Sequence, residues 1–261
     1  LGTRAAGNTA SIDSATVNVG TGTVQVQANN TSHTRSIAAS GAASDGNVGF
    51  AGTVTANELG DDTSAIIDNS LVTAGTVTVR AGEAAAGRTA SIQSLAGGLS
   101  ASKGYSGALA LGVNTINTVR TAQVTGSNLI VSNAVTVQAN AEGAIKTISA
   151  TLAGGKDYAG AGSFSVNTLN ADIHALYDST SDTGGRNSLR GTAGTLRVLA
   201  SGTGTIESFA GAVSGAGFST MRSIWVSRAS WRCRSAVSIR DDCMPSSTTI
   251  RPMNGIRMYS S

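Results

Sequence analysis

Three short patterns recur along this chain at a nearly constant spacing, and this repetition limits the fold more than any other feature. The first is a β-strand alternation of apolar and polar residues, found at Val24-Gln25-Val26, Val77-Thr78-Val79, Val135-Thr136-Val137 and Leu196-Arg197-Val198. The second is an isoleucine ahead of small residues, at Ile37, Ile92, Ile148 and Ile206. The third is an asparagine two residues before leucine or isoleucine, at Asn57, Asn114 and Asn167. The copies lie about 55 residues apart and predict four repeat units, 7–60, 61–117, 118–170 and 171–217.

Within each unit the local pattern is that of β-strands. Segments such as TVQVQA, TVTVRA and TLRVLA alternate apolar and polar residues, as a strand with one buried face requires. Gly, Asn, Ser and Asp between the segments favour tight bends. The Ala- and Gly-rich stretches lack an apolar stripe with helical period. The sequence therefore predicts an all-β fold.

Two all-β architectures fit this pattern, an array of β-sandwiches and a parallel β-solenoid. A sandwich domain runs to about 100 residues, and aromatic residues are only 4% of the chain. We therefore expect a parallel β-solenoid, or β-helix, of about four repeats followed by a non-repeat tail. Val135 and Val137 are predicted to point inward, and Gly154-Gly155 to turn a corner. With two or three coils per unit, the rod would be about 40–60 Å long.

The net charge of +3 invites a nucleic-acid partner, but the charge is unevenly spread. Residues 218–261 contain 7 arginines and 2 aspartates, so the rest of the chain is slightly acidic. Because no basic stripe runs along the repeats, we expect no nucleic-acid partner. No apolar run is long enough for a membrane-spanning helix, and we expect the chain not to span a membrane.

The composition changes abruptly near Phe218. Every Cys, Met, Trp and Pro of the chain lies in 218–261, and the repeat stops in mid-unit. Our hypothesis is that a shift of reading frame produces this tail, which is then out of frame or disordered. The alternative is a genuine cap or different domain. Translation of the neighbouring DNA frames decides between them, because the hypothesis requires another frame to restore the repeat.

Few residues are candidates for chemistry. His33 and His174 have no ligand partners at metal-site spacing and are interpreted as solvated surface residues. The carboxylates are interpreted as turn caps rather than as calcium ligands, because no nine-residue period accompanies them; they are Asp61, Asp62, Asp172, Asp178 and Asp182.

Four glutamates stand alone in the sequence: Glu58, Glu83, Glu142 and Glu207. Polysaccharide-cleaving enzymes need paired carboxylates in a groove. The glycine-rich stretches lack a phosphate-binding motif, and Cys233 and Cys243 could form only a chance disulfide. We therefore expect no enzyme activity, no catalytic or metal-binding residue and no cofactor.

Two stretches of the chain, VTAGTVTVRA…TASIQSLAGG…GALALGVNTIN and VSNAVTVQANAEGAIKTISATLAGG…AGAGSFSVNTLN, resemble the repeats of large bacterial exoproteins. These are the β-solenoid passengers of type V secretion, which include autotransporters and the filamentous-haemagglutinin-like or leukotoxin-like adhesins. The resemblance covers residues 7–217. It implies a secreted or cell-surface fragment of a longer virulence-associated protein, exported through an outer-membrane translocator outside this chain.

The resemblance further implies a structural or adhesive role, as a stalk that binds host or neighbouring-cell surfaces, glycan or protein, by weak multivalent contacts. It supplies no catalytic residue. Two alternatives stay open, a carbohydrate-active β-helix enzyme and a self-assembling extracellular matrix protein.

Overall fold

The computed structural model of the chain is all-β. It describes residues 7–82, 90–178, 189–190, 195–216, 219–235 and 247–252, and the side chains of 7–82, 90–178 and 195–216. Every element in these residues is a strand, and most run for more than ten residues. Long alternating segments with β-branched residues favour such strands, because each places one face against a partner sheet.

Sheet A holds four strands in the order β1-β5-β8-β10. They are β1 (Asn8–Asp13), β5 (Val48–Asp68), β8 (Tyr105–Thr125) and β10 (Tyr158–Tyr177). All three pairings between them are parallel and run without a break in register. Strands that are neighbours in this sheet thus lie about one repeat apart in the sequence.

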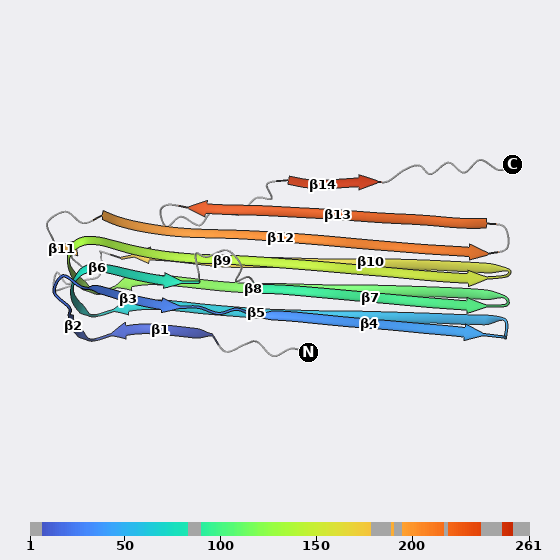
Figure 1. The fold of residues 1–261 in the computed structure, drawn as a ribbon, viewed down its shortest axis with the longest axis horizontal. Coiled ribbons are helices and arrows are strands. Elements are labelled where there is room, and N and C mark those ends of the chain that lie inside the picture. The colour runs from blue at the N-terminus through green and yellow to red at the C-terminus, as the bar shows by residue number, and fades with distance from the viewer. Residues whose placement is uncertain are drawn as a thin grey trace.

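Sheet B holds the other ten strands. Its parallel part contains β2 (Thr16–Asn18), β3 (Thr23–Ala28), β4 (His33–Ser44), β6 (Leu71–Ala81), β7 (Ala90–Ser102), β9 (Asn128–Gly155), β11 (Leu189–Arg190) and β12 (Thr195–Ala216). β9 is continuous, whereas its neighbours in the preceding unit are β6 and β7 with a gap between them. The chain crosses from one sheet to the other at the two ends of a flat slab (Figure 1).

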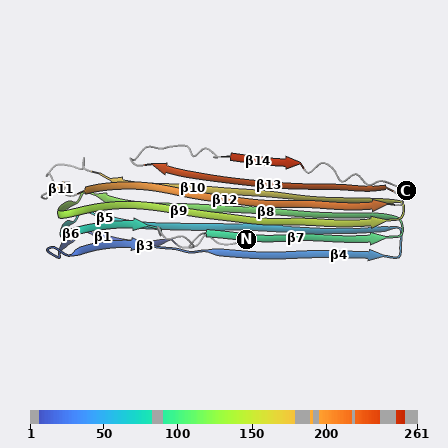
Figure 2. The same ribbon diagram turned by 45° about the horizontal axis from the view of Figure 1, so that its top comes forward.

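The number of coils predicted per unit is wrong. Asn57, Asn114 and Asn167 lie on neighbouring strands of sheet A and are 57 and 53 residues apart in sequence. Each unit therefore crosses each sheet once rather than two or three times. The long axis of the molecule lies along the strands (Figures 1 and 2), and 28-residue β9 spans about 90 Å at about 3.3 Å per residue.

Two of the three sequence patterns align in register. Val77 pairs with Val24 on one side and with Val135 on the other. Asn114 likewise pairs with Asn57 and with Asn167. The prediction that Val135 and Val137 point inward is confirmed, since both are fully buried.

The isoleucine pattern is out of register at Ile37 and Ile148, which both pair with Leu95 rather than with Ile92. Ile92 pairs with Ile145, not with Ile148, whereas Ile148 pairs with Leu95. The two isoleucines of β9 are three residues apart and therefore point to opposite faces of the strand. Ile145 is 1% exposed and Ile148 is 39% exposed, so only the first belongs to the core.

The two sheets enclose a core that differs between the two halves of the slab. We call the part with β8 residues 116–125 and β9 residues 128–145 the valine half. Its interior is an apolar cluster that includes Ile67, Val79, Val124, Leu129 and Val137. A second, smaller cluster joins Ile92, Ile116 and Ile145 at the middle of the slab. Here the apolar residues point inward, as the alternation predicts.

The other half, with β8 residues 105–115 and β9 residues 146–155, reverses this arrangement, and we call it the serine half. Its buried residues are small or polar, such as Ser94, Ala110, Thr147 and Ser149. Hydroxyl groups pair across the interior, with Thr55 Oγ1 2.9 Å from Ser94 Oγ. Small inward side chains let two sheets pack closely, and the large apolar residues consequently lie outside.

The corners repeat from unit to unit. At the end of the valine half, Ser14, Asn69 and Gly126 all have positive φ, of 50°, 45° and 54°. These three residues directly follow β1, β5 and β8. At the other end the chain leaves β9 at Gly155 and enters β10 at Tyr158. The corner lies at Lys156-Asp157, directly after the predicted Gly154-Gly155, which are the last two residues of the strand.

The tail departs from the parallel pattern. β13 (Ser219–Ser235) pairs antiparallel with β12, and β14 (Ser247–Pro252) pairs antiparallel with β13. All other pairings in the described residues are parallel. The side chains of Cys233 and Cys243 lie outside the described residues. The predicted frame shift stays a prediction, but the repeat geometry does end where the sequence pattern ends.

The register of β9 can be tested by a matched pair of substitutions. Ile145→Ala removes a fully buried side chain and is expected to lower the free energy of unfolding by about 2–5 kcal/mol. Ile148→Ala, three residues away on the outer face, is expected to change it by less than about 1 kcal/mol. Urea denaturation followed by circular dichroism measures both. Equal losses for the two variants would contradict the observed register.

Candidate functional site

A buried ion pair lies near the middle of sheet A. Arg120 on β8 and Asp61 on β5 have side chains that are 4% and 0% exposed. Arg120 Nη1 donates to Asp61 Oδ1 at 3.0 Å and to the Asp61 carbonyl oxygen at 2.8 Å, and Nη2 donates to Asp61 Oδ2. Asp61 pairs in register with Thr118, so the guanidinium reaches diagonally across to the neighbouring strand.

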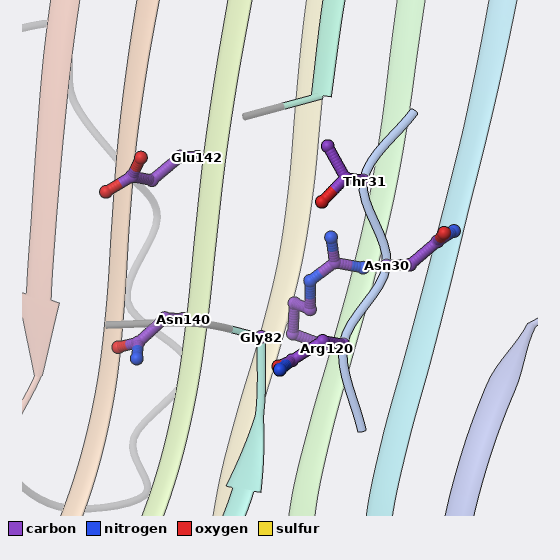
Figure 3. A pocket seen from close by; sticks show the side chains of 7 residues that line it. Asn30, Thr31, Gly82, Arg120, Asn140 and Glu142 are labelled. Atoms are coloured by element: carbon purple, nitrogen blue, oxygen red, sulfur yellow. The ribbon is translucent and has the colours of Figure 1, made fainter. Parts of the chain in front are cut away.

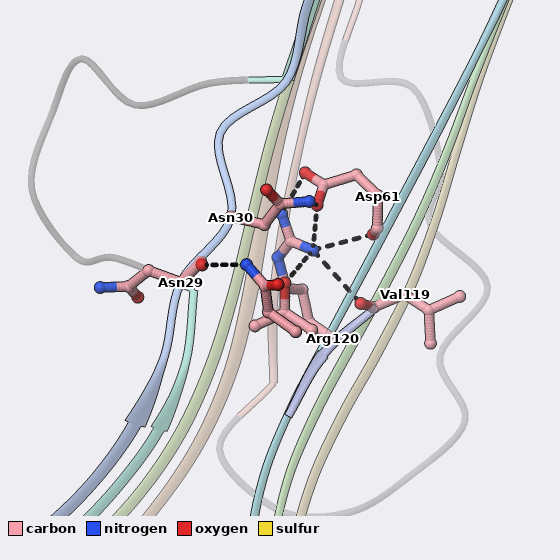
Figure 4. A network of polar contacts seen from close by, with 7 residues as sticks. Asn29, Asn30, Asp61, Val119 and Arg120 are labelled. Atoms are coloured by element: carbon pink, nitrogen blue, oxygen red, sulfur yellow. Dashed lines mark hydrogen bonds and ion pairs between the residues drawn. The ribbon is translucent and has the colours of Figure 1, made fainter. Parts of the chain in front are cut away.

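Further hydrogen bonds surround the pair. Arg120 Nη1 also donates to Thr63 Oγ1 at 2.8 Å and to the Val119 carbonyl oxygen at 3.3 Å. Asn30 Nδ2 donates to Asp61 Oδ1 at 2.8 Å. Figure 4 shows Asn30 and Arg120 meeting at the Asp61 carboxylate. The carboxylate thus has both a charged and a neutral donor, which partly offsets the cost of burying it.

The ion pair lies where sheet B is interrupted. β3 ends at Ala28 and β4 begins at His33, and the next strand of the sheet ends at Ala81. Gly82 has φ +80°, and a Cβ on it would lie 2.1 Å from the Asn140 carbonyl oxygen. Only glycine can therefore bring the chain this close to β9 directly after β6.

A shallow pocket opens at this break. It has about 280 Å³ of empty space, including open solvent, and is lined by Asn29, Asn30, Thr31, Gly82, Arg120, Asn140 and Glu142. Asn140 and Glu142 come from β9, and Asn30 and Thr31 come from the segment between β3 and β4 (Figure 3). The enclosed part leaves room for about one water molecule.

Two donors at this pocket have no hydrogen-bond partner, Arg120 Nε and Asn140 Nδ2. A single water molecule between polar groups commonly satisfies such donors. The guanidinium is otherwise held by five contacts within the protein, so the pocket fits a structural water better than a substrate. The hydrogen bonds keep the Arg120–Asp61 pair buried inside the slab. Among the residues that line the pocket, one, Glu142, carries a carboxylate.

Next to the ion pair, an asparagine ladder crosses sheet A. Asn57 Nδ2 donates to Asn114 Oδ1 at 2.7 Å, and Asn114 Nδ2 donates to Asn167 Oδ1 at 2.8 Å. Thr147 Oγ1 on β9 accepts from Asn114 Nδ2 and donates to Asn167 Oδ1, both at 2.8 Å. The ladder therefore links three units along sheet A and joins sheet A to sheet B.

The two histidines lie on the surface, apart from the ion pair. His33 is the first residue of β4, and its Nδ1 is 2.7 Å from Ser91 Oγ. It therefore lies at the start of a strand. His174 on β10 lies 2.7 Å from Asp172 Oδ1, with both side chains more than half exposed. A single carboxylate neighbour on the surface does not make a metal site.

The interpretation of the aspartates as turn caps is wrong for Asp61, Asp62 and Asp172, because all three lie inside strands. Their short polar side chains look like bend residues in sequence, and the ion pair that holds Asp61 in a strand involves a residue 59 positions away. Asp178 follows β10, and Asp182 lies outside the described residues.

The glutamates are dispersed. Glu58 is exposed on β5, Glu142 lines the pocket, and Glu83 lies outside the described residues. Glu207 is not isolated, because its Oε2 lies 3.9 Å from Lys146 Nζ. In the part of the chain that the structure describes, no three His, Cys, Asp or Glu residues are grouped so that they could hold a metal ion. None of the described segments is a helix able to cross a membrane.

Sequence reasoning missed Arg120 and Asn140. The available signal for Arg120 was its position in VNTINTVRTAQV. It lies an even number of residues from Asn114 and Ile116, so all three point to the same face of the strand. Reading the parity of the whole strand would have placed it inside. No comparable signal marks Asn140, which is buried together with both of its chain neighbours, Ala139 and Ala141.

Tyr177, at the end of β10, packs against the valine core. Its hydroxyl oxygen is buried and has no hydrogen-bond partner. Burial raises the pKa of this hydroxyl above its ordinary value of 10.0, because the charged phenolate is poorly solvated there.

No family model, curated protein or solved structure matches this chain.

The ion pair can be tested by breaking and then replacing it. Arg120→Met leaves Asp61 buried without its cation and is expected to cost about 3–5 kcal/mol in the free energy of unfolding. The double variant Asp61→Leu/Arg120→Met removes both charges and is expected to regain most of that loss. Chemical denaturation measures both variants.

Lys103→Met is the matched control for this experiment. Lys103 and Asp45 form an exposed pair at 3.3 Å, and its loss is expected to cost no more than about 1 kcal/mol. If Arg120→Met were as stable as this control, the buried pair would have no structural importance.

Tyr177 gives a prediction about pH. Because its folded-state pKa is raised, the neutral hydroxyl favours the folded state, and this contribution is lost as the pH rises above about 10. Tyr177→Phe is expected to raise stability by about 1 kcal/mol at neutral pH, since it removes a buried hydroxyl without a partner, and to flatten the alkaline fall in stability. Thermal unfolding from pH 8 to pH 11 measures both effects. A parallel fall in both proteins would contradict the assignment to Tyr177.

Proposed function

We propose that this chain is a structural and adhesive segment of a bacterial exoprotein, in which the two sheets are the walls of one flattened β-solenoid. Each unit of about 55 residues would make a single turn, with one strand in each wall. The parallel pairing of β5, β8 and β10, and of β6 and β7 with β9, supports this geometry.

One observation carries the functional proposal. The units stack in register, so equivalent side chains recur on neighbouring strands about 4.8 Å apart. On the outer face of sheet A, Thr115 pairs with Thr168 and Asn117 pairs with Asn170, and Asn170 Nδ2 donates to Asn117 Oδ1 at 2.9 Å. From the middle of the slab into the valine half, the outer face of β8 and β10 therefore presents paired hydroxyl and amide groups.

Repeated polar rows favour adhesion over catalysis. Each hydroxyl or amide contact with a glycan or protein surface is weak, but an array of contacts gives avidity well above that of any single contact. The expected setting is the cell surface or extracellular space, with host or neighbouring cells as partners and export through a translocator outside these residues. The resemblance of 7–217 to type V passengers motivates this setting.

Retention of coated beads under flow tests the proposal. Beads carrying the chain at increasing density are passed over a mucin-coated surface and over a protein-blocked surface. We expect retention on mucin to rise more steeply than density, because several contacts must form together. Soluble chain should compete only weakly.

The double variant Asn117→Ala/Asn170→Ala is expected to lower retention several-fold, whereas Thr136→Ala on sheet B is a matched control. Equal retention on the two surfaces would count against adhesion. Release of reducing sugar from the mucin would instead support the carbohydrate-active alternative.

A further inference from the structure

The outer face of sheet A changes character at the middle of the slab. In the serine half, the outward positions of β5 from 48 to 56, of β8 from 105 to 113 and of β10 from 158 to 166 carry only Val, Phe, Tyr, Leu, Ala and Gly. Apart from two tyrosine hydroxyls, no polar or charged side chain interrupts them. We call this surface the aromatic face.

The large residues of the aromatic face are well exposed. Phe50, Val54, Tyr158 and Phe164 are 67%, 64%, 65% and 62% exposed. Monomeric proteins rarely leave an apolar surface of this kind uncovered unless it contacts something. The reversed alternation of the serine half makes the exposure systematic, because inward positions are taken by Ser, Thr, Ala and Gly.

Glycines on neighbouring strands make room for the large side chains of the aromatic face. The Phe50 ring lies over Gly107, where an added Cβ would be 2.9 Å from the ring, and Leu109 lies beside Gly162. The rings of Tyr105 and Tyr158 stack with centroids 5.2 Å apart and planes 11° apart. The large side chains thus pack against one another across the strands, and an apolar sheet face of this kind can pack against another sheet face.

A lipid bilayer fits this face poorly. Among the described residues, no strand pairs with the side of β10 that faces away from β8, and β1 pairs only with residues 63–68 of β5. In this part of the chain the aromatic face therefore has backbone N–H and C=O groups without a strand partner on both sides. Open sheet edges do not occur in the hydrocarbon region, because each unsatisfied group there costs several kcal/mol.

The area is sufficient for a pair of copies. Four aromatic side chains, each with about 150–250 Å² and about 60% exposed, contribute roughly 400–600 Å² per copy. Two copies face to face would bury about 1,000 Å² from the aromatic rings alone, which reaches the size of a specific interface. The aliphatic residues add to this area.

We propose that the aromatic face is a self-association surface, on which the same face of a second copy of this chain packs sheet on sheet, about 10 Å away. An apolar face without charge can pack against itself, and a twofold axis that lies between the two copies would bring each row against its counterpart. This goes beyond the proposed adhesive function, which uses the polar rows of the valine half.

Sedimentation velocity over a concentration series tests the proposal with the full chain. Wild type is expected to form a dimer at about 10–100 µM, which is typical of a modest interface. Phe164→Lys places a charge at an exposed position of the face and is expected to weaken dimerisation at least about tenfold. Circular dichroism checks that the variant keeps its strands.

Two matched controls locate the surface. Thr121→Lys changes an outward residue of β8 in the valine half, on the same face of sheet A. Leu152→Lys changes a residue on the outer face of sheet B in the serine half. Both are expected to leave dimerisation unchanged. A monomeric wild type at all concentrations, or loss of the dimer in Leu152→Lys but not in Phe164→Lys, would overturn the proposal.

Cross-linking gives an independent measurement. Leu111 lies on the central strand between Val54 and Phe164, so a twofold axis brings its two copies close together. Leu111→Cys, in a background with Cys233→Ser and Cys243→Ser, is expected to be cross-linked to a dimer by a short bismaleimide, which spans the separation of about 10 Å between packed sheets that a disulfide cannot bridge. Thr121→Cys in the same background is not expected to be cross-linked. Flotation of monomeric chain with phosphatidylcholine vesicles, without cross-linking, would overturn self-association in favour of a lipid surface.

Discussion

The whole structure depends on parallel pairing between strands that lie about one repeat apart. In such a stack each side chain meets its own counterpart from the next unit, so a residue type is tolerated only if it packs well against itself. Valine ladders in the core and the asparagine ladder satisfy this condition, since the amide of asparagine is both a donor and an acceptor. The hydrogen bonds from Asn57 to Asn114 and from Asn114 to Asn167 are its clearest expression.

A charge inside the stack cannot satisfy the same condition, because like charges in register repel each other. The structure accommodates one such pair by placing Asp61 and Arg120 on neighbouring strands at diagonal positions. The break in sheet B next to them lets Asn30 reach the carboxylate. An irregularity in one sheet thus accompanies a buried charge in the other, and the regular units need neither.

Much of the fold could be predicted from the sequence because self-stacking leaves a visible period. The valine and asparagine patterns gave the correct register, and the alternation gave an all-β chain with parallel strands. The number of coils could not be predicted, since a 55-residue unit with short bends can be divided in several ways. Ile148 was aligned with Ile92 in place of Ile145, because the two isoleucines of β9 are only three residues apart. The ion pair was missed because its partners are remote in sequence.

The serine half shows that alternation alone does not say which face is inside. Its interior uses hydroxyl pairs such as Ser100 with Ser106, at 2.9 Å, in place of apolar burial. A hydrogen bond of this kind contributes about 1 kcal/mol, whereas a buried leucine or phenylalanine contributes about 1.5–3 kcal/mol. This half therefore keeps much of its hydrophobic driving force on the outside, where the proposed second copy would use it.

The pairing distance also has a consequence for the order in which the chain folds. A strand of sheet A finds its first partner only after more than fifty further residues are available, and contacts of such long range form slowly. Once one pair of units is in place, however, each later strand adds to an edge that already has the right shape. Folding would then start slowly and continue quickly in one direction, which suits a chain that emerges gradually from a ribosome or a pore.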